Sequence, residues 1–264
     1  MNIKAEGSSA FSFLRKEASV LHEEYKEQLS ERVTLTHLRG ATATTTDALL
    51  LAAFLPRTEG RALELGAGCG IVSILAAARD RFPAADLCER NGTLADLARR
   101  NIAENRLTDR LTVVETDLRT LSLPPRYASV FANPPYQRAG DGRPASNPLA
   151  DIARFERAGT ITDFCLAAER SLTSGGSFSL VFPLARRREL DAALAKAGLF
   201  PALSVTVYPY PGGEPKLLLL RATREKAEES KGYFILSKQP GGEPTDGALT
   251  LYREGILMIE GVSK

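Results

Sequence analysis

Short apolar runs alternate with amphipathic stretches through the middle of the chain. A buried strand has a short apolar run, whereas apolar residues three and four positions apart form one face of a helix. We therefore predict an α/β fold, with a mostly parallel sheet and helices on both of its faces. The expected strands are Arg61–Leu65, Ala84–Cys88, Leu111–Glu115, Tyr127–Ala132 and Ser177–Phe182. The expected helices are Ile71–Ala78, Leu94–Asn105, Thr162–Leu172 and Arg187–Ala197.

Two later segments, Ser204–Val207 and Leu217–Ala222, are rich in β-forming residues and can pair as a hairpin. Such a pair predicts an antiparallel strand at the edge of the sheet. Ahead of the first strand, Asp47 precedes an apolar helix that Pro56 closes. An aspartate in this position is a good N-cap. The sheet and its helices are expected to occupy residues 34–224.

The two ends of the chain are expected to be additions to this domain. Residues 1–33 are predicted to be a helical appendage, because apolar positions recur there at helical spacing. Residues 225–264 are predicted to be an extension packed on the main domain, with short strands at Phe234–Leu236 and Leu249–Tyr252. The apolar positions of the first segment are Phe11, Leu14, Ala18, Leu21 and Tyr25.

Composition excludes several classes of protein. Hydrophobic residues make up 44% of the 264 residues, which excludes a wholly disordered chain, and a net charge of +2 excludes a strongly basic nucleic-acid binder. Cys69, Cys88 and Cys165 match no zinc spacing, and their odd number argues against a disulfide framework. With only His22 and His37 besides, we expect no metal site. No apolar run approaches the ~20 residues of a membrane span, so we expect a cytoplasmic protein.

Three glycines with the spacing G-x-G-x-G follow the first expected strand of the sheet. Gly66, Gly68 and Gly70 lie between that strand and the next helix, where ligands bind in open α/β sheets. The spacing is tighter than the G-x-G-x-x-G of dinucleotide sites. Glu64 lies just upstream, and its carboxylate would repel a pyrophosphate but suit an amino-acid moiety and a sulfonium cation.

Acidic residues follow the next two expected strands. Glu89 ends the second strand, where a carboxylate can accept hydrogen bonds from a ribose diol. Asp117 follows the third strand and could accept from an adenine amine. Taken alone, a glycine turn is often only a tight turn and a terminal acid is often a helix cap. Together, on three successive strand ends, they predict S-adenosylmethionine as the cofactor rather than NAD.

The motif Asn133-Pro134-Pro135-Tyr136 follows the fourth strand at the same edge. Two prolines make a stiff turn without backbone N–H donors. The Asn133 side-chain oxygen and the Pro134 carbonyl can accept the two hydrogens of an NH₂ group and direct its lone pair at a methyl donor. Tyr136 offers a flat face for a planar amide or base. Asn133, Pro134 and Tyr136 are therefore the predicted catalytic residues.

The glycine segment Leu63–Gly70, taken with Asn133–Tyr136, resembles the class I S-adenosylmethionine-dependent methyltransferases that act on a planar nitrogen. Within that class the chain resembles the bacterial tRNA1(Val) adenine-N6-methyltransferase family. Three further segments carry this finer resemblance: Asp47–Leu51, Ala153–Glu156 and Glu214–Leu219. Phe155 departs from the pattern, because the family usually has histidine there.

The resemblance implies a Rossmann-like fold with a seven-stranded, mostly parallel sheet and an antiparallel edge strand. It also implies methylation of the adenine next to the anticodon of a valine tRNA, and hence phosphate contacts. The predicted cofactor-binding residues are Asp47, Glu64, Gly66, Ala67, Gly68, Gly70, Glu89, Arg90, Asp117, Leu118 and Asn133. The arginines proposed to contact phosphate, against the alternative of a solvated surface, are Arg138, Arg143, Arg154, Arg157, Arg186, Arg187 and Arg188.

Three other functions remain open from the sequence. A glutamine N5-methyltransferase of a release factor shares the Asn-Pro-Pro-Tyr motif, but that family usually has a larger helical N-terminal domain than residues 1–33 provide. An adenine-N6 methyltransferase of ribosomal RNA or DNA would use the same chemistry. A non-catalytic, RNA-binding methyltransferase fold would not need the intact glycines, Asn133 and Tyr136.

Overall fold

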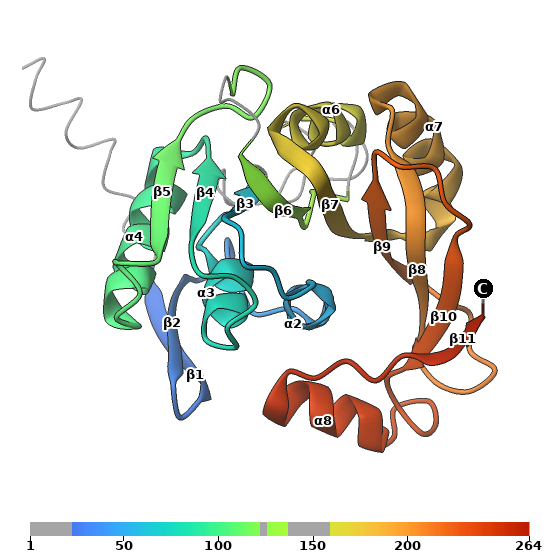
Figure 1. Cartoon of the computed structure of the whole chain (residues 1–264). Helices are drawn as coiled ribbons and strands as arrows, with labels where there is room; N and C mark the ends of the chain where they lie inside the picture. Colours follow the sequence, from blue (N-terminus) through green and yellow to red (C-terminus); the bar gives the residue numbers. More distant parts are fainter. Residues whose placement is uncertain (1–22, 122–125, 137–158, 264) are drawn as a thin grey trace, which may run out of the picture.

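The computed structural model describes residues 23–121, 126–136 and 159–263. In these residues one sheet contains nine strands, and β5 lies at one end of it while β10 and β11 lie at the other (Figure 1). The strands of this sheet are β3 (Ala62–Leu65), β4 (Ala85–Glu89), β5 (Leu111–Glu115), β6 (Tyr127–Ala132), β7 (Leu172–Pro183), β8 (Phe200–Tyr208), β9 (Leu217–Thr223), β10 (Ser230–Ile235) and β11 (Glu260–Ser263). The helices are α2 (Thr46–Phe54), α3 (Ile71–Ala77), α4 (Gly92–Glu104), α6 (Ile161–Ser171), the short 3-10 helix η2 (Leu184–Arg186), α7 (Arg187–Ala197) and α8 (Asp246–Glu254).

The strand order is β11-β10-β8-β9-β7-β6-β3-β4-β5. Strands β3 to β7 run parallel, which confirms the predicted mostly parallel sheet. Strand β9 runs antiparallel to both β7 and β8, so the expected hairpin forms, but its antiparallel strand is internal and not at the edge. The edge is extended because β10 pairs in parallel with β8 and β11 then pairs with β10. With β10 and β11 the sheet has nine strands, whereas seven were expected.

The sheet is covered on both faces, as the alternation of strands and helices predicted. One hydrophobic cluster joins β2, α2, α3, α4 and α8 to one face of the sheet. A second cluster joins α6 and α7 to the other face. Helix α2 packs against β7 and β9, so it lies over the middle of the sheet.

The chain begins its described part with a β-hairpin and not with a helix. Strands β1 (Glu24–Ser30) and β2 (Val33–Leu38) pair antiparallel. The expected helix is therefore wrong at Tyr25, because alternate residues of β1 are half-buried, a period of two that suits a strand. The rest of that predicted helix lies outside the described residues. Strand β2 is fastened to α4 by Asn101, which accepts from the Thr36 N–H at 2.8 Å and donates to the Thr36 carbonyl at 3.1 Å.

The C-terminal extension contains one further correction. Phe234 lies in a strand, as predicted, but Leu249–Tyr252 lies in the helix α8. The hydroxyl of Thr245 caps this helix by accepting from the Ala248 N–H at 3.1 Å. Buried Ala248 and Leu251 then pack on the sheet at helical spacing, which outweighs the β-propensity of the segment.

Candidate functional site

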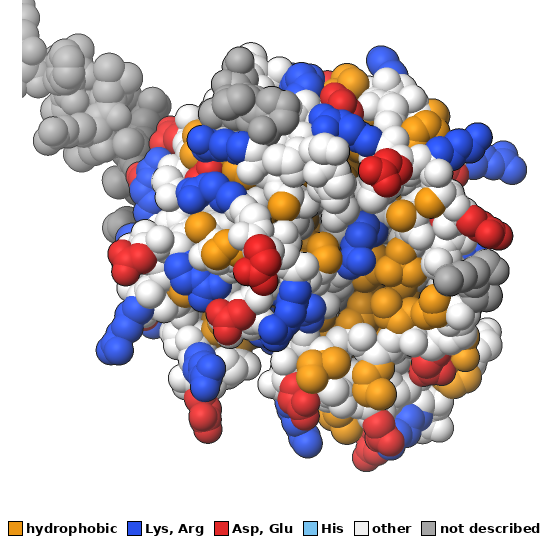
Figure 2. Space-filling model, in the orientation of Figure 1, with side chains coloured by type: hydrophobic (Ala, Val, Ile, Leu, Met, Phe, Trp, Pro, Cys, Tyr) orange, Lys and Arg blue, Asp and Glu red, His pale blue; other side chains and the backbone are white. Residues whose placement is uncertain are grey.

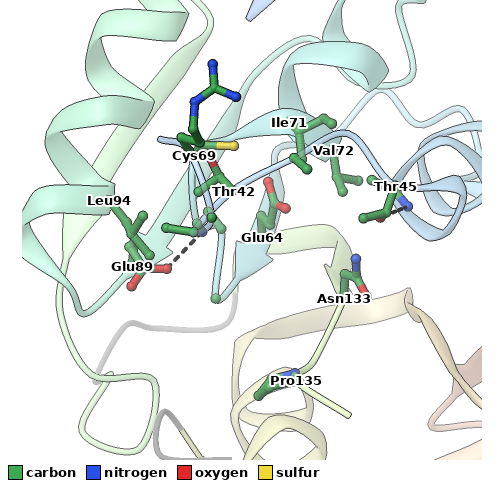
Figure 3. Close-up of a pocket in the computed structure, with 18 of the residues that line it drawn as sticks. Thr42, Thr45, Glu64, Cys69, Ile71, Val72, Glu89, Leu94, Asn133 and Pro135 are labelled. Atoms are coloured by element: carbon green, nitrogen blue, oxygen red, sulfur yellow. Dashed lines mark hydrogen bonds between the residues drawn. The ribbon is translucent and has the colours of Figure 1, made fainter. Parts of the chain in front are cut away.

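A cavity of about 530 Å³ opens at the carboxyl ends of the central strands. Ligand pockets typically have volumes of about 300–1,000 Å³. Figure 3 shows Glu89 and Asn133 on opposite sides of this cavity, with Glu64 between them. The predicted residues that line it together are Glu64, Gly66, Ala67, Gly68, Glu89 and Asn133.

The glycine loop joins β3 to α3 and forms one wall of the cavity. Gly68 has a φ of +57°, a conformation that residues with a Cβ rarely adopt. A Cβ placed on Gly68 would meet no protein atom within 4 Å, so the loop leaves open space beside its backbone. At Gly66, with a φ of +71°, a Cβ would press within 3.3 Å of the Phe164 ring. The glycines therefore allow a ligand to approach the backbone closely.

Glu89 connects the end of β4 to this loop. One of its carboxylate oxygens, Oε2, accepts from the Gly68 N–H at 2.8 Å, and Oε1 accepts from the Asn91 N–H at 2.8 Å. Burial raises the pKa of Glu89, and the backbone donors partly oppose this. Each carboxylate oxygen has two lone pairs, so each can accept one further hydrogen bond from a ligand. The arrangement suits a pair of neighbouring hydroxyl groups.

Glu64 is the most deeply buried carboxyl group of the site, with 2% of its surface exposed. Its Oε2 accepts from the Ser73 N–H at 3.2 Å and from the Ser73 hydroxyl. Burial raises the pKa of Glu64 to about 8, and the neighbouring charge of Glu89 adds to the effect. The side chain is therefore mostly neutral at pH 7 until a cation lies beside it.

The Asn-Pro-Pro-Tyr motif begins directly after β6. Asn133 and Pro135 line the cavity, and the Tyr136 hydroxyl donates to Oδ1 of Asn133 at 2.9 Å. The Tyr136 ring meets Phe182 edge-on, with ring centroids 6.3 Å apart. Arg186 donates from Nη1 to the Tyr136 carbonyl at 2.8 Å, which holds the end of the motif in place.

Asp47 lies close to this motif, in the first turn of α2. Burial raises its pKa, while the Tyr136 hydroxyl, which can donate to Asp47 in place of Asn133, opposes the shift. The prediction that Asp47 is the N-cap of the helix is wrong. Thr45 is the N-cap, and its hydroxyl accepts from the Ala48 N–H at 3.3 Å.

Several predicted residues do not belong to the cavity wall formed by the described residues. Asp117 is paired with Arg119 at 2.5 Å and with Arg90 at 3.2 Å, and these arginines hold its pKa well below the usual range. Leu118 is buried in the core cluster beneath α6. The predicted residues that do not line the cavity are Asp47, Gly70, Arg90, Asp117, Leu118, Pro134 and Tyr136.

The cavity wall also contains residues that were not among the predicted site residues. Thr42 and Thr45 line the cavity from the segment before α2, and a run of small polar residues ahead of an apolar helix was the signal for them. Phe164 lines the cavity from α6, and the helical pattern of the sequence does not distinguish this residue from a core residue. Arg39 and Tyr25 come from the hairpin, with the guanidinium 5.6 Å from the ring centre.

Two arginines of the predicted phosphate-binding run are held in ion pairs. Arg186 pairs with Glu189, while Arg187 pairs with Asp191 at 2.7 Å and with Glu229 at 3.0 Å. Arg186 and Arg187 are half-buried, and Arg188 is the exposed arginine of the run. The predicted residues that lie outside the described part are Arg138, Arg143, Arg154, Phe155 and Arg157.

The described residues contain no group of three or more His, Cys, Asp or Glu placed to bind a metal ion. None of the helices in that part is long and apolar enough to cross a membrane. Cys69, Cys88 and Cys165 are free thiols, and burial raises the pKa of each to about 12.

Known proteins are similar to this chain in sequence and in fold. Residues 43–197 match the family described as the methyltransferase small domain. A tRNA1(Val) (adenine(37)-N6)-methyltransferase of Aeromonas hydrophila is 30% identical over 209 residues, which cover 78% of this chain and 86% of the relative. The enzyme of the same name from Bacteroides fragilis is 27% identical and covers 87% and 97% of the two chains. A crystal structure of a predicted O-methyltransferase from Agrobacterium tumefaciens shares the fold, with a TM-score of 0.64, 24% identity, and coverage of 81% and 98%.

The parallel sheet, the glycine loop and the acid at the end of β4 define a Rossmann-like methyltransferase that depends on S-adenosylmethionine. The chain belongs to the methyltransferase small domain family and, within it, to the group of the tRNA1(Val) (adenine(37)-N6)-methyltransferases.

Proposed function

We propose that the enzyme transfers a methyl group from S-adenosylmethionine to the exocyclic N6 of an adenine in tRNA. One observation carries the proposal: the amide of Asn133 lies in the same cavity as Glu64, Gly68 and Glu89. An acceptor for an NH₂ group and a cofactor site therefore share one space. The names of the relatives support tRNA as the substrate, because each is a tRNA adenine-N6-methyltransferase.

The cavity fits this cofactor on chemical grounds. Buried Glu64 would face its cationic part, and the two oxygens of Glu89 would accept from its ribose hydroxyls. Gly66, Ala67 and Gly68 would allow close contact with backbone. When bound, the cofactor supplies an electrophilic methyl group. The predicted cofactor-binding residues outside the cavity wall would act by position: Gly70 starts α3, Asp47 faces Tyr136, and Arg90 with Asp117 and Leu118 supports the end of β5.

The motif would orient the target amine. The Asn133 side-chain oxygen and the Pro134 carbonyl would each accept one N–H, which directs the nitrogen lone pair toward the methyl donor. The Tyr136 face would stack on the adenine ring. A strong general base is not required, because the nitrogen becomes acidic once it is methylated and then loses a proton to solvent.

The substrate must present its base outside a helical stack. An adenine inside folded RNA has to be flipped out to reach Asn133, and loops of RNA allow this at the lowest cost. A tRNA substrate would also place the enzyme in the cytoplasm.

A direct substrate test separates this proposal from the glutamine alternative. Purified enzyme is given radiolabelled S-adenosylmethionine together with unmodified tRNA, ribosomal RNA, or a release factor, each in a separate reaction. We expect label in the tRNA. Label in the release factor alone would assign the same residues to glutamine methylation, and label only in ribosomal RNA would change the RNA class. Cofactor binding without transfer to any of the three would contradict the proposed activity.

A further inference from the structure

A second cavity, of about 350 Å³, lies next to the proposed cofactor site. Strand β1, the beginning of α2, the end of α3 and helix α8 form its walls, and Thr45 lines both cavities. Arg79 is the cation in its wall. The carboxylate of Glu27, which also lines it, lies 3.3 Å from the His37 ring nitrogen. The guanidinium of Arg79 has no hydrogen-bond or ion-pair partner in the described part, and its Nη1 is buried.

Helix α8 holds the Arg79 guanidinium in this position. Gly255 ends α8 with a φ of +65°, and a Cβ there would overlap the Arg79 side chain, at 1.7 Å from Nε. The C-terminal extension therefore packs directly over this arginine. A glycine at the helix end leaves the space that the guanidinium occupies.

Two more half-buried arginines approach from the loop after α3 and from β9. Arg81 donates from Nη2 to the Ala53 carbonyl at 3.0 Å, and Arg221 donates from Nη2 to the Phe54 carbonyl. These bonds cap the carboxyl end of α2, where positive charge is stabilising. They use one N–H group of each guanidinium. Nε of both residues is buried and has no partner in the described part.

These three arginines differ from the other arginines of the described part. Every other half-buried arginine there pairs with a carboxylate. Burial lowers the pKa of Arg79, of Arg81 and of Arg221, the last to about 10, and the charge of Arg81 adds to the effect on the other two. Exposed Arg57 adds a fourth positive charge near Arg81. Desolvated cations without a counter-charge are costly, so the cluster favours an anion.

The chemistry of the cluster selects the anion. Guanidinium groups from two separate elements, with unused N–H donors, match the several oxygens of a phosphate better than a single carboxylate. Figure 2 shows Lys and Arg side chains at the middle of one face of the molecule, beside a hollow with hydrophobic side chains. We propose that Arg79, Arg81 and Arg221 bind a phosphate group of the RNA backbone, an inference that rests on the proposed tRNA substrate.

The test measures binding of unmodified tRNA to the full chain without S-adenosylmethionine, as a function of salt. Arg79→Gln is the informative variant, because Arg79 makes no bond to the protein that its loss would break. Arg170→Gln, an exposed arginine of α6, is the matched control. One lost phosphate contact weakens binding about five- to eightfold near 0.1 M salt and reduces the slope of log K against log salt by roughly 0.7–0.9. We expect this change in Arg79→Gln and none in Arg170→Gln.

Thermal unfolding in inorganic phosphate, at constant ionic strength, provides an independent readout. We expect phosphate to raise the Tm of the wild type but not that of Arg79→Gln. Without phosphate the variant should be at least as stable as the wild type, because it lacks a desolvated and unpaired positive charge. The inference would be overturned if Arg79→Gln bound tRNA with the same affinity and the same salt dependence as the wild type. If phosphate still protected the wild type in that case, the cluster would belong to a free phosphate ion.

Failure of this inference can be told from failure of the proposed function. Arg79-dependent tRNA binding without any methyl transfer would leave the phosphate contact intact and contradict the tRNA methyltransferase activity. If the wild type methylates tRNA but Arg79→Gln binds tRNA as the wild type does, the proposed activity stands and the phosphate contact is contradicted.

Discussion

The Tyr136 hydroxyl donates to the Asn133 side-chain oxygen at 2.9 Å. This oxygen is the atom that we propose accepts a hydrogen bond from the target amine. The tyrosine therefore uses one of the two lone pairs of this oxygen and competes with the substrate for it. Asp47 is a second acceptor within reach of the same hydroxyl. Rotation of the hydroxyl from Asn133 to Asp47 would free the amide for the incoming base.

Removing only the hydroxyl tests this competition. Tyr136→Phe keeps the ring for stacking and frees the Asn133 oxygen, so we expect kcat/KM for tRNA to be unchanged or raised. Tyr136→Ala also removes the stacking face, and the loss of about 1–3 kcal/mol per stacked base should lower kcat/KM roughly 5- to 150-fold. Steady-state kinetics of both variants provide the check. Equal losses in the two variants would show that the hydroxyl, and not the ring, carries the role.

Cofactor affinity should depend on pH through Glu64. The pKa of this carboxyl is raised to about 8 in the free protein, and a bound cation favours its ionised form. Binding below pH 8 therefore requires release of a proton. Affinity for S-adenosylmethionine should rise with pH, by at most about tenfold per unit, and level off once Glu64 is ionised in the free protein.

Glu64→Gln removes the titrating group but keeps an oxygen for Ser73 to donate to. We expect its affinity to be independent of pH between 6 and 8 and to fall below that of the wild type at the upper end. Glu115→Gln, at an exposed carboxyl of β5, is the control and should follow the wild type. Isothermal titration at several pH values measures this, and identical pH dependence in Glu64→Gln and the wild type would exclude Glu64 as the cause.

Glu89 is expected to affect cofactor binding in two ways. It would accept hydrogen bonds from the ribose, and its hydrogen bond from the Gly68 N–H holds the glycine loop in place. Hydrogen bonds to a charged group contribute about 1.5–3 kcal/mol, so Glu89→Ala should weaken S-adenosylmethionine binding roughly 10- to 150-fold. Glu89→Gln keeps one oxygen and should lose less. Equilibrium binding distinguishes the cases, and unchanged affinity in Glu89→Ala would make Glu89 a structural cap only.

The central strands could be predicted because each is a short apolar run followed at once by glycine or polar residues. The end of β6 at Ala132 and the end of β5 at Glu115 agree with the expected ends, and so Asn133 was placed at the correct edge. The ends of the chain were harder. Tyr25 and Leu249–Tyr252 lie in segments where periods of two and of about 3.6 compete over a few residues, and tertiary packing decides between them.

The finer features of the site depend on contacts that no local pattern records. The pKa of Glu64 follows from its burial and from Ser73, nine positions away. The hydrogen bond between Tyr136 and Asn133 depends on the backbone conformation of the two prolines between them. Several polar residues precede α2, and only the backbone geometry selects Thr45 and not Asp47 as its cap.

The central claim is that Asn133 orients an adenine amine of tRNA for methylation. The most direct measurement is single-turnover methylation of unmodified tRNA, followed by nucleoside analysis, for the wild type and Asn133→Ala. We predict N6-methyladenosine in the wild-type product, and a rate about 10²- to 10³-fold lower in the variant, as when one positioned polar group is lost from an active site. The variant should bind S-adenosylmethionine like the wild type. Equal loss of cofactor binding and rate, or methylation at another atom, would contradict the account.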